Sequence, residues 1–369
     1  MTEYYITVLL VLFFSSATER TKKDGRIAEG KEKAYWRCVF LTGMVLTLVA
    51  GLRYCVGTDY LAYMSGFGSR ANRLLSDLKA LDEPGLDLIA WICRAIYDDY
   101  ALVFFACSLI TVSLNVRTMA RYSGSFFYAA MLYIFIGAWH GAFNGIRQYM
   151  AAAIVFAGHR FILEKKFPQY AAVVAVAFLF HRTALIMLPV YFLANTKISY
   201  RSLLIFIGVA LVLRFSSGGI FAYMSSVKGH EQTQYAYMQT EVNIFRVLVA
   251  LAPCIFVVLL NAEKLADREN TFYLNLLLIN GAFMLSTSNS AYLARVGIFT
   301  DIYATIGFPK LVYSMYQQKI EGLSRFIKRE DNRGYHQLMI AILVLYSIFW
   351  LYEVSSRDAY NHFQWIFSR

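Results

Sequence analysis

The apolar run Cys38-Val-Phe-Leu-Thr-Gly-Met-Val-Leu-Thr-Leu-Val-Ala-Gly-Leu52 passes directly into Arg53-Tyr-Cys-Val-Gly-Thr-Asp-Tyr-Leu-Ala-Tyr63. The first run has the character of a membrane-spanning helix, which needs roughly 17–25 predominantly apolar residues. The second run gathers an arginine, a glycine, an aspartate and several tyrosines at the point where that helix leaves the membrane. A loop that only connects two helices has no need of this composition. The stretch therefore predicts a membrane protein with a functional segment at a membrane boundary.

The composition of the whole chain agrees with this interpretation. Hydrophobic residues make up 58% of the 369 residues, and the mean hydropathy is +0.47, whereas about half of the residues of a soluble domain are apolar. Only 5 prolines occur, which suits long helices because proline interrupts them. We expect an all-α integral membrane protein, a polytopic helical bundle that forms a single domain over residues 1–369.

Apolar segments predict about twelve spans. They lie at 4–18, 37–52, 99–116, 124–139, 146–162, 168–181, 183–195, 202–214, 243–261, 271–287, 295–313 and 336–352. Lysines and arginines concentrate in short loops on one side, as the positive-inside rule requires, and this places the N-terminus outside.

The opposite, extracytoplasmic side then receives a main outer loop at about 53–98 and a second outer loop at about 214–242, together with 286–295 and 353–369. In the main outer loop, apolar side chains recur at helical spacing over Leu86–Tyr97 and predict a short interfacial helix. The polar segment 225–242 suggests a mobile loop that covers a site.

The net charge of +11 invites a nucleic-acid interpretation. Topology accounts for this charge, because the basic residues lie in predicted cytoplasmic loops, so we expect no nucleic-acid partner. The 5 cysteines lack CxxC and zinc-type spacings. We expect inert thiols and no metal, although a disulfide between Cys55 and Cys93 stays open because both belong to the main outer loop. Asp98 and Asp99 would point apart on a helix, which argues against a metal site there.

Arg147 is the strongest single candidate for function. It lies in a segment that is otherwise apolar, and ionisable groups at membrane depth are costly and usually functional. If residues 140–148 are helical, His140, Asn144 and Gln148 share its face. The alternative is an arginine that reaches back to the membrane interface beside a polar helix N-terminus.

Other polar residues mark further boundaries between apolar segments. His181 and Arg182 interrupt an apolar run, and they mark either a site or a tight turn between helices. Arg53 suits phosphate because its planar guanidinium group can donate two parallel hydrogen bonds. Asp59 would act as a base on a hydroxyl group or would orient Arg53 through an ion pair. Arg295 begins the eleventh predicted span behind a stretch rich in serine.

Three motifs, in order along the chain, resemble those of the EpsG family of Wzy-like exopolysaccharide polymerases. The first runs over 53–60 with Tyr63 and is similar to the family signature RxxVGxDYxxY, and Glu83-Pro84 matches the EP pair that follows it. Residues 144–148 with Ala151 resemble NxxRQxxA, and residues 180–185 with Pro189 resemble FHxSA followed by proline, with Thr183 in place of the usual serine. The final third of the chain matches mainly in hydropathy.

The resemblance implies a bacterial inner-membrane enzyme. Such enzymes join oligosaccharide repeat units carried on undecaprenyl pyrophosphate at the outer face, and they produce O-antigen, capsule or exopolysaccharide. The implied partners are the lipid-linked glycan donor and acceptor, membrane lipid and a chain-length regulator protein. No cofactor or metal is needed, because the pyrophosphate already activates the sugar.

In this interpretation cations stabilise the charge that builds on the leaving pyrophosphate. The predicted catalytic residues are Asp59, Arg147 and His181, where Asp59 or His181 would accept the proton of the acceptor hydroxyl. The predicted substrate-binding residues are Arg53, Tyr60, Tyr63, His140, Asn144, Gln148, Arg182, Tyr292 and Arg295. Among these, the arginines would contact pyrophosphate and the tyrosines would stack on sugars.

Two rival classes stay open. A flippase or other transporter of lipid-linked oligosaccharides would also need a cationic cavity, but it would break no bond. Another membrane transferase, such as a GT-C-type enzyme that uses a lipid monophosphate sugar or an O-acetyltransferase, would release a different product. A purely structural scaffold is disfavoured by the arginines within apolar segments.

Overall fold

A computed structural model describes the chain in residues 1–23, 26–73, 77, 79, 82–196, 207–212, 214–215, 240–259, 267–317, 333–356, 360 and 362–369. These residues are almost entirely helical, as the sequence predicts. They divide into two compact units, which we describe separately. Unit 1 comprises Met1–Leu188 and Met339–Arg369, and unit 2 comprises Pro189–Leu338. A single polytopic domain stays a prediction.

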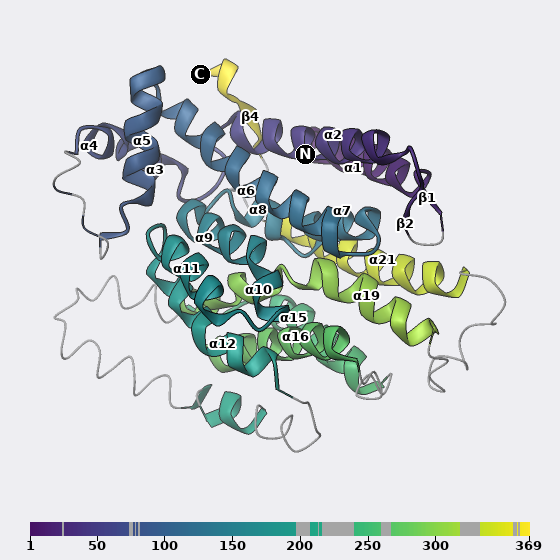
Figure 1. Cartoon of the computed structure of the whole chain (residues 1–369). Coiled ribbons are helices and arrows are strands. Elements are labelled where there is room, and N and C mark those ends of the chain that lie inside the picture. The colour runs from purple at the N-terminus through teal and green to yellow at the C-terminus, as the bar shows by residue number, and fades with distance from the viewer. Residues whose placement is uncertain are drawn as a thin grey trace. The chain divides into compact units, whose positions relative to one another are not determined.

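Three long helices form the frame of unit 1 (Figure 1). They are α1 (Thr2–Glu19), α2 (Glu32–Gly51) and α6 (Tyr100–Tyr122). Helix α2 packs against both α1 and α6, and a short hairpin, β1 (Lys22–Lys23) with β2 (Arg26–Ile27), links α1 to α2. Asp99 begins α6 because its carboxylate accepts a hydrogen bond from the Ala101 N–H at 2.8 Å.

Shorter apolar elements complete the first part of unit 1. They are α7 (Phe126–Phe135), α8 (Ala138–Gly141), α9 (Ile146–Ala157), α10 (His159–Leu163), α11 (Phe167–Phe178) and η3 (Arg182–Ile186), and α12 (Met187–Ala194) then leads into unit 2. Helix α9 packs against α6 and α11. It thereby brings the Asn144–Gln148 motif to the segment that joins α11 to η3.

The main outer loop contains its own helices. After β3 (Arg53–Tyr54) come α3 (Tyr60–Ser65), α4 (Phe67–Ala71) and α5 (Gly85–Ile96). Helix α5 occupies the predicted interfacial segment. It buries Leu86, Ile89 and Cys93 and exposes Trp91 and Ile92, so it has the two-faced character that the spacing indicates.

The C-terminal segment pairs with the main outer loop. Helix α21 (Arg333–Ser356) is followed by β4 (Gln364–Trp365) and η6 (Ile366–Ser368). Strand β4 runs antiparallel to β3, with Arg53 opposite Trp365, and the guanidinium of Arg369 bonds to the Asp99 carboxylate. The two segments that the sequence places on one side of the membrane are therefore paired.

Unit 2 is built around α16 (Arg268–Thr287), which packs against α15 (Ile244–Leu259) and α19 (Ala304–Gln317). Between α16 and α19 lie α17 (Ala291–Ala294), η5 (Arg295–Gly297) and α18 (Ile298–Asp301). The predicted span 295–313 is thus a series of short helical pieces rather than one continuous helix.

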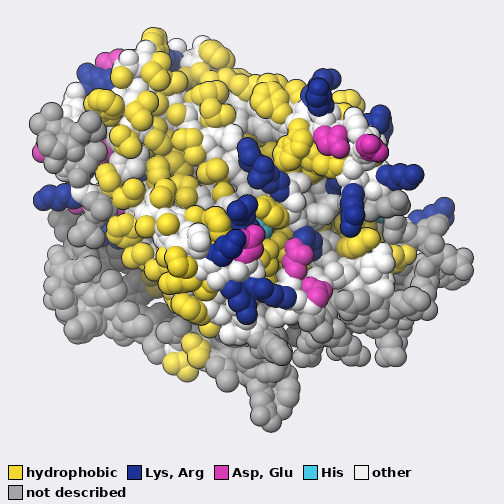
Figure 2. Space-filling view, viewed as in Figure 1, with side chains coloured by type: hydrophobic (Ala, Val, Ile, Leu, Met, Phe, Trp, Pro, Cys, Tyr) yellow, Lys and Arg dark blue, Asp and Glu magenta, His cyan; other side chains and the backbone are white. Residues whose placement is uncertain are grey.

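Among the described residues, 3 helices are long and apolar enough to cross a membrane, namely Glu32–Gly51, Tyr100–Tyr122 and Arg333–Ser356. Shorter apolar helices coincide with several further predicted spans, and apolar side chains spread widely over the face seen in Figure 2. These features support a membrane protein, whereas about twelve spans stays a prediction. Much of the expected span 202–214 and loop 225–242 lies outside the described residues.

Gly57 offers a test of how the outer loop is built. Its φ is +106°, and an added Cβ would lie 2.7 Å from the Phe143 carbonyl oxygen and 2.9 Å from Asn144 Oδ1. We expect Gly57→Ala to lower the free energy of unfolding by about 1–3 kcal/mol. Thermal unfolding of the purified protein measures this change.

Gly68→Ala is the matched control. Gly68 lies in α4 of the same loop, and an added Cβ there would meet nothing within 4 Å. Equal melting temperatures for the two variants would contradict the close packing of the Gly57 turn against residues 143 and 144.

Candidate functional site

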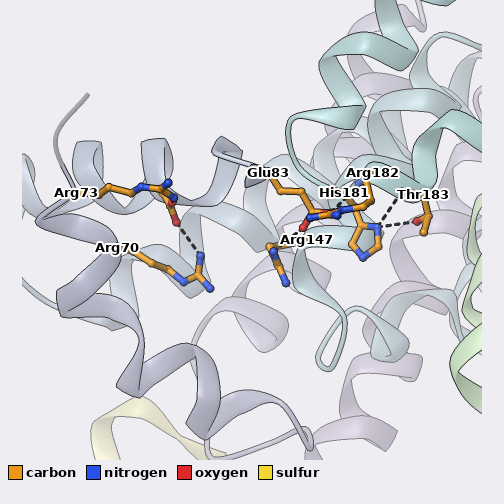
Figure 3. Close-up of polar contacts among 8 residues, drawn as sticks. Arg70, Arg73, Glu83, Arg147, His181, Arg182 and Thr183 are labelled. Carbon is orange, nitrogen blue, oxygen red and sulfur yellow. Dashed lines mark hydrogen bonds and ion pairs between the residues drawn. The ribbon is translucent and has the colours of Figure 1, made fainter. Parts of the chain in front are cut away.

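A buried carboxylate, that of Glu83, holds two arginines from distant parts of unit 1 (Figure 3). Its Oε2 accepts a hydrogen bond from Arg147 Nη1 at 2.7 Å. Its Oε1 accepts bonds from both the backbone N–H of Arg182, at 2.8 Å, and the Arg182 Nε, at 3.2 Å. The Glu83 side chain is 7% exposed, whereas Arg147 is 30% and Arg182 is 67% exposed. Glu83 thus anchors two cations that face partly outward.

The turn that carries Glu83 is fixed by the residues behind it. The Gly85 N–H donates to the Leu179 carbonyl at 2.8 Å, and a Cβ on Gly85 would lie 2.6 Å from the Phe180 ring. Glu83 itself has a φ of +56°, a region that costs energy for residues other than glycine and is enriched at functional sites. The Glu83-Pro84 pair therefore docks the main outer loop onto the end of α11.

The net charge of Glu83, Arg147 and Arg182 favours the binding of an anionic ligand. Burial raises the pKa of Glu83, but the hydrogen bond from the Arg182 N–H and the charges of the neighbouring basic side chains, Arg147 among them, outweigh that rise, so the net pKa lies below the ordinary glutamate value. Glu83 is therefore ionised at neutral pH. One carboxylate faces two guanidinium groups, and the three side chains together carry one net positive charge.

A second set of contacts lies beside Arg182. Thr183 Oγ1 lies 2.6 Å from His181 Nδ1, and the Thr183 N–H donates to the same nitrogen at 3.3 Å. Gln148, buried on α9 next to Arg147, donates from Nε2 to Thr183 Oγ1 at 3.3 Å. Five residues of the second and third motifs thus lie together in this group, as their common predicted side of the membrane suggests: Arg147, Gln148, His181, Arg182 and Thr183.

Tyr63 also borders this group. Burial raises the pKa of Tyr63 and the Arg147 guanidinium counteracts that rise, which places the phenol beside the guanidinium. Tyr63 packs edge-to-face on Phe104, with ring centroids 6.5 Å apart. Of the three predicted sugar-stacking tyrosines, this one lies next to the arginines.

Arg53 has a different position from the one predicted. It is 2% exposed, its nitrogens donate to the carbonyl oxygens of Ala50, Val56 and Phe143, and its guanidinium lies 4.6 Å from the centroid of the Phe143 ring. These contacts occupy the guanidinium N–H donors that were expected to bind phosphate. Arg53 therefore stabilises the outer loop, and its predicted contact with substrate does not fit the structure.

Asp59 does not orient Arg53. No described ion pair joins these two residues, and the Asp59 carboxylate instead accepts a hydrogen bond from Thr58 Oγ1 at 3.3 Å. Asp59 precedes the first residue of α3 and is half-buried. The ion-pair alternative is wrong, and the role of Asp59 as a base stays a prediction.

Three further predicted binding residues are part of the scaffold. Tyr60 is buried and stacks on Phe104, with ring centroids 4.3 Å apart. Asn144 Oδ1 accepts from the Thr58 N–H at 2.7 Å, and its Nδ2 donates to the Tyr360 hydroxyl at 2.5 Å. His140 is buried edge-on against the same Tyr360. Their side chains hold the outer loop and the C-terminal segment, so substrate contact by them does not fit the structure.

Tyr292 and Arg295 belong to unit 2. Tyr292 is exposed on α17, and Arg295 begins η5. Their participation in the site stays a prediction. Unit 2 also has a buried polar contact that the sequence analysis did not single out, in which Thr300 Oγ1 donates to Asn280 Oδ1 at 2.8 Å.

Sequence reasoning also missed two features of unit 1. Glu83 was noted as part of a motif but not as the anchor, although a carboxylate directly before a proline and a helix was the available signal. Asp87, one helical turn later, is buried and binds Arg70 at 2.7 Å and Arg73 at 2.8 Å. This second carboxylate ties α4 to α5.

The structure also reports on metals and thiols. Within the described ranges, no group of three or more His, Cys, Asp or Glu side chains could hold a metal ion. The cysteines are free thiols, with Cys55 exposed and Cys93 buried. The disulfide left open between these two is therefore not formed.

Comparison with known proteins agrees with the motifs. The family described as the EpsG family matches residues 35–367 of the chain. No curated protein and no solved structure matches significantly. The match includes all of the residues that meet around Glu83.

The lowered pKa of Glu83 predicts a particular dependence of stability on pH. Because the folded-state pKa lies below the ordinary value of 4.5, the ionised carboxylate stabilises the fold above that value, and this stabilisation is lost as the pH falls through the folded pKa. We expect Glu83→Gln to lower the free energy of unfolding at neutral pH by about 1–3 kcal/mol. The wild-type melting temperature should therefore approach that of the variant on acidification.

The exposed Glu29 provides the control. Glu29→Gln should leave both the melting temperature at neutral pH and its decline in acid unchanged. A constant difference between wild type and Glu83→Gln from neutral pH down to about pH 3 would contradict the ionised anchor.

Proposed function

Because the chain belongs to the EpsG family, we propose that it polymerises lipid-linked oligosaccharide repeat units by glycosyl transfer at the outer face of the bacterial inner membrane. The observation that carries this proposal is the pair of arginines on Glu83. Arg147 and Arg182 present guanidinium groups from two different elements to one place. Such a pair suits a pyrophosphate, which offers several acceptor oxygens.

The chemistry explains why cations are needed. The bond between the anomeric carbon and the phosphate oxygen of the donor breaks, and a bond forms to a hydroxyl oxygen of the acceptor. Undecaprenyl pyrophosphate leaves with additional negative charge, and preorganised donors stabilise a transition state in which that charge develops. The hydroxyl proton passes to a base, for which Asp59 is our candidate.

The geometry of Arg147 supports a role in binding. Its Nη1 is committed to Glu83, whereas its Nε is buried with no hydrogen-bond partner among the described residues. A buried donor without a partner is costly, and native structures keep few of them. A phosphate oxygen of the substrate would reach this buried donor only after a local rearrangement, whereas the 30% of the side chain that is exposed is accessible without one.

The remaining predicted features belong to the same proposal. Tyr63 borders Arg147 and would stack on a sugar. The substrate-binding roles of Tyr292 and Arg295, which belong to unit 2, stay predictions from the sequence. The lipid carrier would lie in the membrane beside the apolar surface, and a chain-length regulator protein would act as partner. The predicted topology places this site on the extracytoplasmic side of the membrane.

A reconstituted reaction tests the proposal. The purified protein is incubated with synthetic repeat units linked to undecaprenyl pyrophosphate, and both the glycan ladder and the released undecaprenyl pyrophosphate are quantified. We expect the ladder with wild type and a loss of about 10²–10³ in rate for Arg147→Ala, the typical effect of removing one such donor. Arg147→Lys should behave more like Arg147→Ala than like wild type, because lysine keeps the charge but lacks the fork.

Arg160→Ala is the matched control. Arg160 lies on α10 against the ring of Phe161, at 5.0 Å from its centroid, in a predicted cytoplasmic loop, and its removal should leave the rate unchanged. If the folded wild type binds the lipid-linked units and leaves them intact, polymerisation is refuted and a flippase becomes the leading function. Release of undecaprenyl phosphate instead would indicate a GT-C-type transferase.

A further inference from the structure

The hydrogen bonds of His181 determine which of its ring nitrogens carries the proton. The backbone N–H of Thr183 points to Nδ1 at 3.3 Å. A backbone N–H can only donate, so Nδ1 must be an acceptor and cannot carry a proton in this arrangement. The imidazole is then neutral, and its proton lies on Nε2.

The side chain of Thr183 is compatible with the same tautomer. Gln148 Nε2 donates to Thr183 Oγ1 at 3.3 Å, which leaves the hydroxyl proton available to His181 Nδ1, 2.6 Å away. With Nδ1 fixed as an acceptor by the backbone N–H, the bonds run from the amide to the hydroxyl and from the hydroxyl to the ring. Gln148 is buried, so this direction is set within the packed part of unit 1.

We infer that Gln148 and Thr183 hold His181 with its proton on Nε2, so that His181 donates a hydrogen bond to the departing pyrophosphate. This inference rests on the proposed function for the identity of the ligand. It replaces the prediction that His181 accepts the proton of the acceptor hydroxyl, because Nδ1 is occupied and Nε2 is protonated. Gln148 and Thr183 become positioning residues rather than substrate contacts.

His181 joins the same anion site as the arginines. It directly precedes Arg182, whose N–H and Nε bind Glu83, and Figure 3 shows its ring beside that group. In the transfer step the bond from sugar carbon to phosphate oxygen breaks while the bond to the acceptor oxygen forms. The acceptor proton passes to a base, and the Nε2–H keeps its own proton while its hydrogen bond to the leaving oxygen strengthens.

A purely structural role would explain some of the same contacts. The His181 side chain caps η3 by accepting from the Thr183 N–H, and this cap uses Nδ1 alone. Two substitutions separate the possibilities. Asparagine reproduces the cap, because its side-chain oxygen is a favoured acceptor at such positions. Glutamine reaches the position of Nε2 with an amide N–H and so reproduces the donor.

The test measures kcat for His181→Gln and His181→Asn in the reconstituted reaction. We expect His181→Gln to stay within about tenfold of wild type, because one hydrogen bond is re-formed with altered geometry. His181→Asn should lose about 10²–10³, the effect of removing a transition-state donor. Equal, severe losses of kcat in both variants would identify His181 as a base. An active His181→Asn together with an inactive His181→Gln would show that His181 only caps η3. Either result overturns the inference.

A spectroscopic measurement tests the tautomer without any substrate. In protein labelled with ¹⁵N-histidine, the signals of His181 are assigned by their absence from His181→Gln. We expect an unprotonated Nδ1 and a protonated Nε2 in wild type and in Thr183→Ser, and a weaker preference for this tautomer in Thr183→Val, where only the backbone N–H of residue 183 still donates to Nδ1. We also expect kcat to fall about 5- to 10-fold in Thr183→Val and to be maintained in Thr183→Ser.

The two readouts distinguish the possible failures. A protonated Nδ1 in wild type would overturn the inference even if polymer is made. A wild type with the expected tautomer that makes no polymer would refute the proposed function, and with it the pyrophosphate as ligand, while the arrangement of Gln148, Thr183 and His181 would stand.

Discussion

The buried carboxylate of Glu83 is the constraint on which the candidate site depends. Arg147 and Arg182 are cations that would repel each other at close range, and the carboxylate between them offsets that repulsion. Glu83 contacts residues 64 and 99 positions away along the chain, so one side chain connects the main outer loop, α9 and η3. Removing one partner of a buried ion pair is far more damaging than its net contribution to stability suggests, because the other charges are left uncompensated.

The first motif, in contrast, acts mainly as scaffold. Arg53 donates to three backbone carbonyls, and Asn144 holds both the Thr58 N–H and the hydroxyl of Tyr360. Strand β4 adds backbone pairing to β3. An irregular loop has backbone groups that need hydrogen-bond partners, and this motif supplies them. The loop is thereby held in one conformation, and Tyr63 and Glu83 are held with it.

Much of the fold could be predicted from the sequence because membrane helices are recognised by their length and their apolar composition. The segments 4–18 and 336–352 lie within helices, 37–52 and 99–116 exceed α2 and α6 by one residue each, and the spacing over Leu86–Tyr97 identified α5. Breaks inside apolar segments could not be predicted in the same way. Hydropathy averaged over 295–313 does not distinguish one long helix from the pieces η5, α18 and α19, because most residues of the whole segment are apolar.

The motifs identified the family. The structure brings Arg147, Gln148, His181 and Arg182 together, whereas their functional roles stay predictions. Sequence position alone could not decide the direction of an arginine at a membrane boundary. Arg53 turns inward because the carbonyl of Phe143, 90 residues away, happens to lie within its reach, and such a contact exists only after the tertiary structure has formed.

The difference between the arginines is therefore a difference between their partners. Arg53 is saturated by fixed carbonyl oxygens at 2% exposure, and a ligand could reach it only by disrupting the loop. The guanidinium groups of Arg147 and Arg182 both bond to the Glu83 carboxylate, and these side chains are 30% and 67% exposed. If the ligand is a pyrophosphate, it meets donors whose orientation has already been set during folding, and this is the condition under which fixed charges lower the barrier of a group transfer.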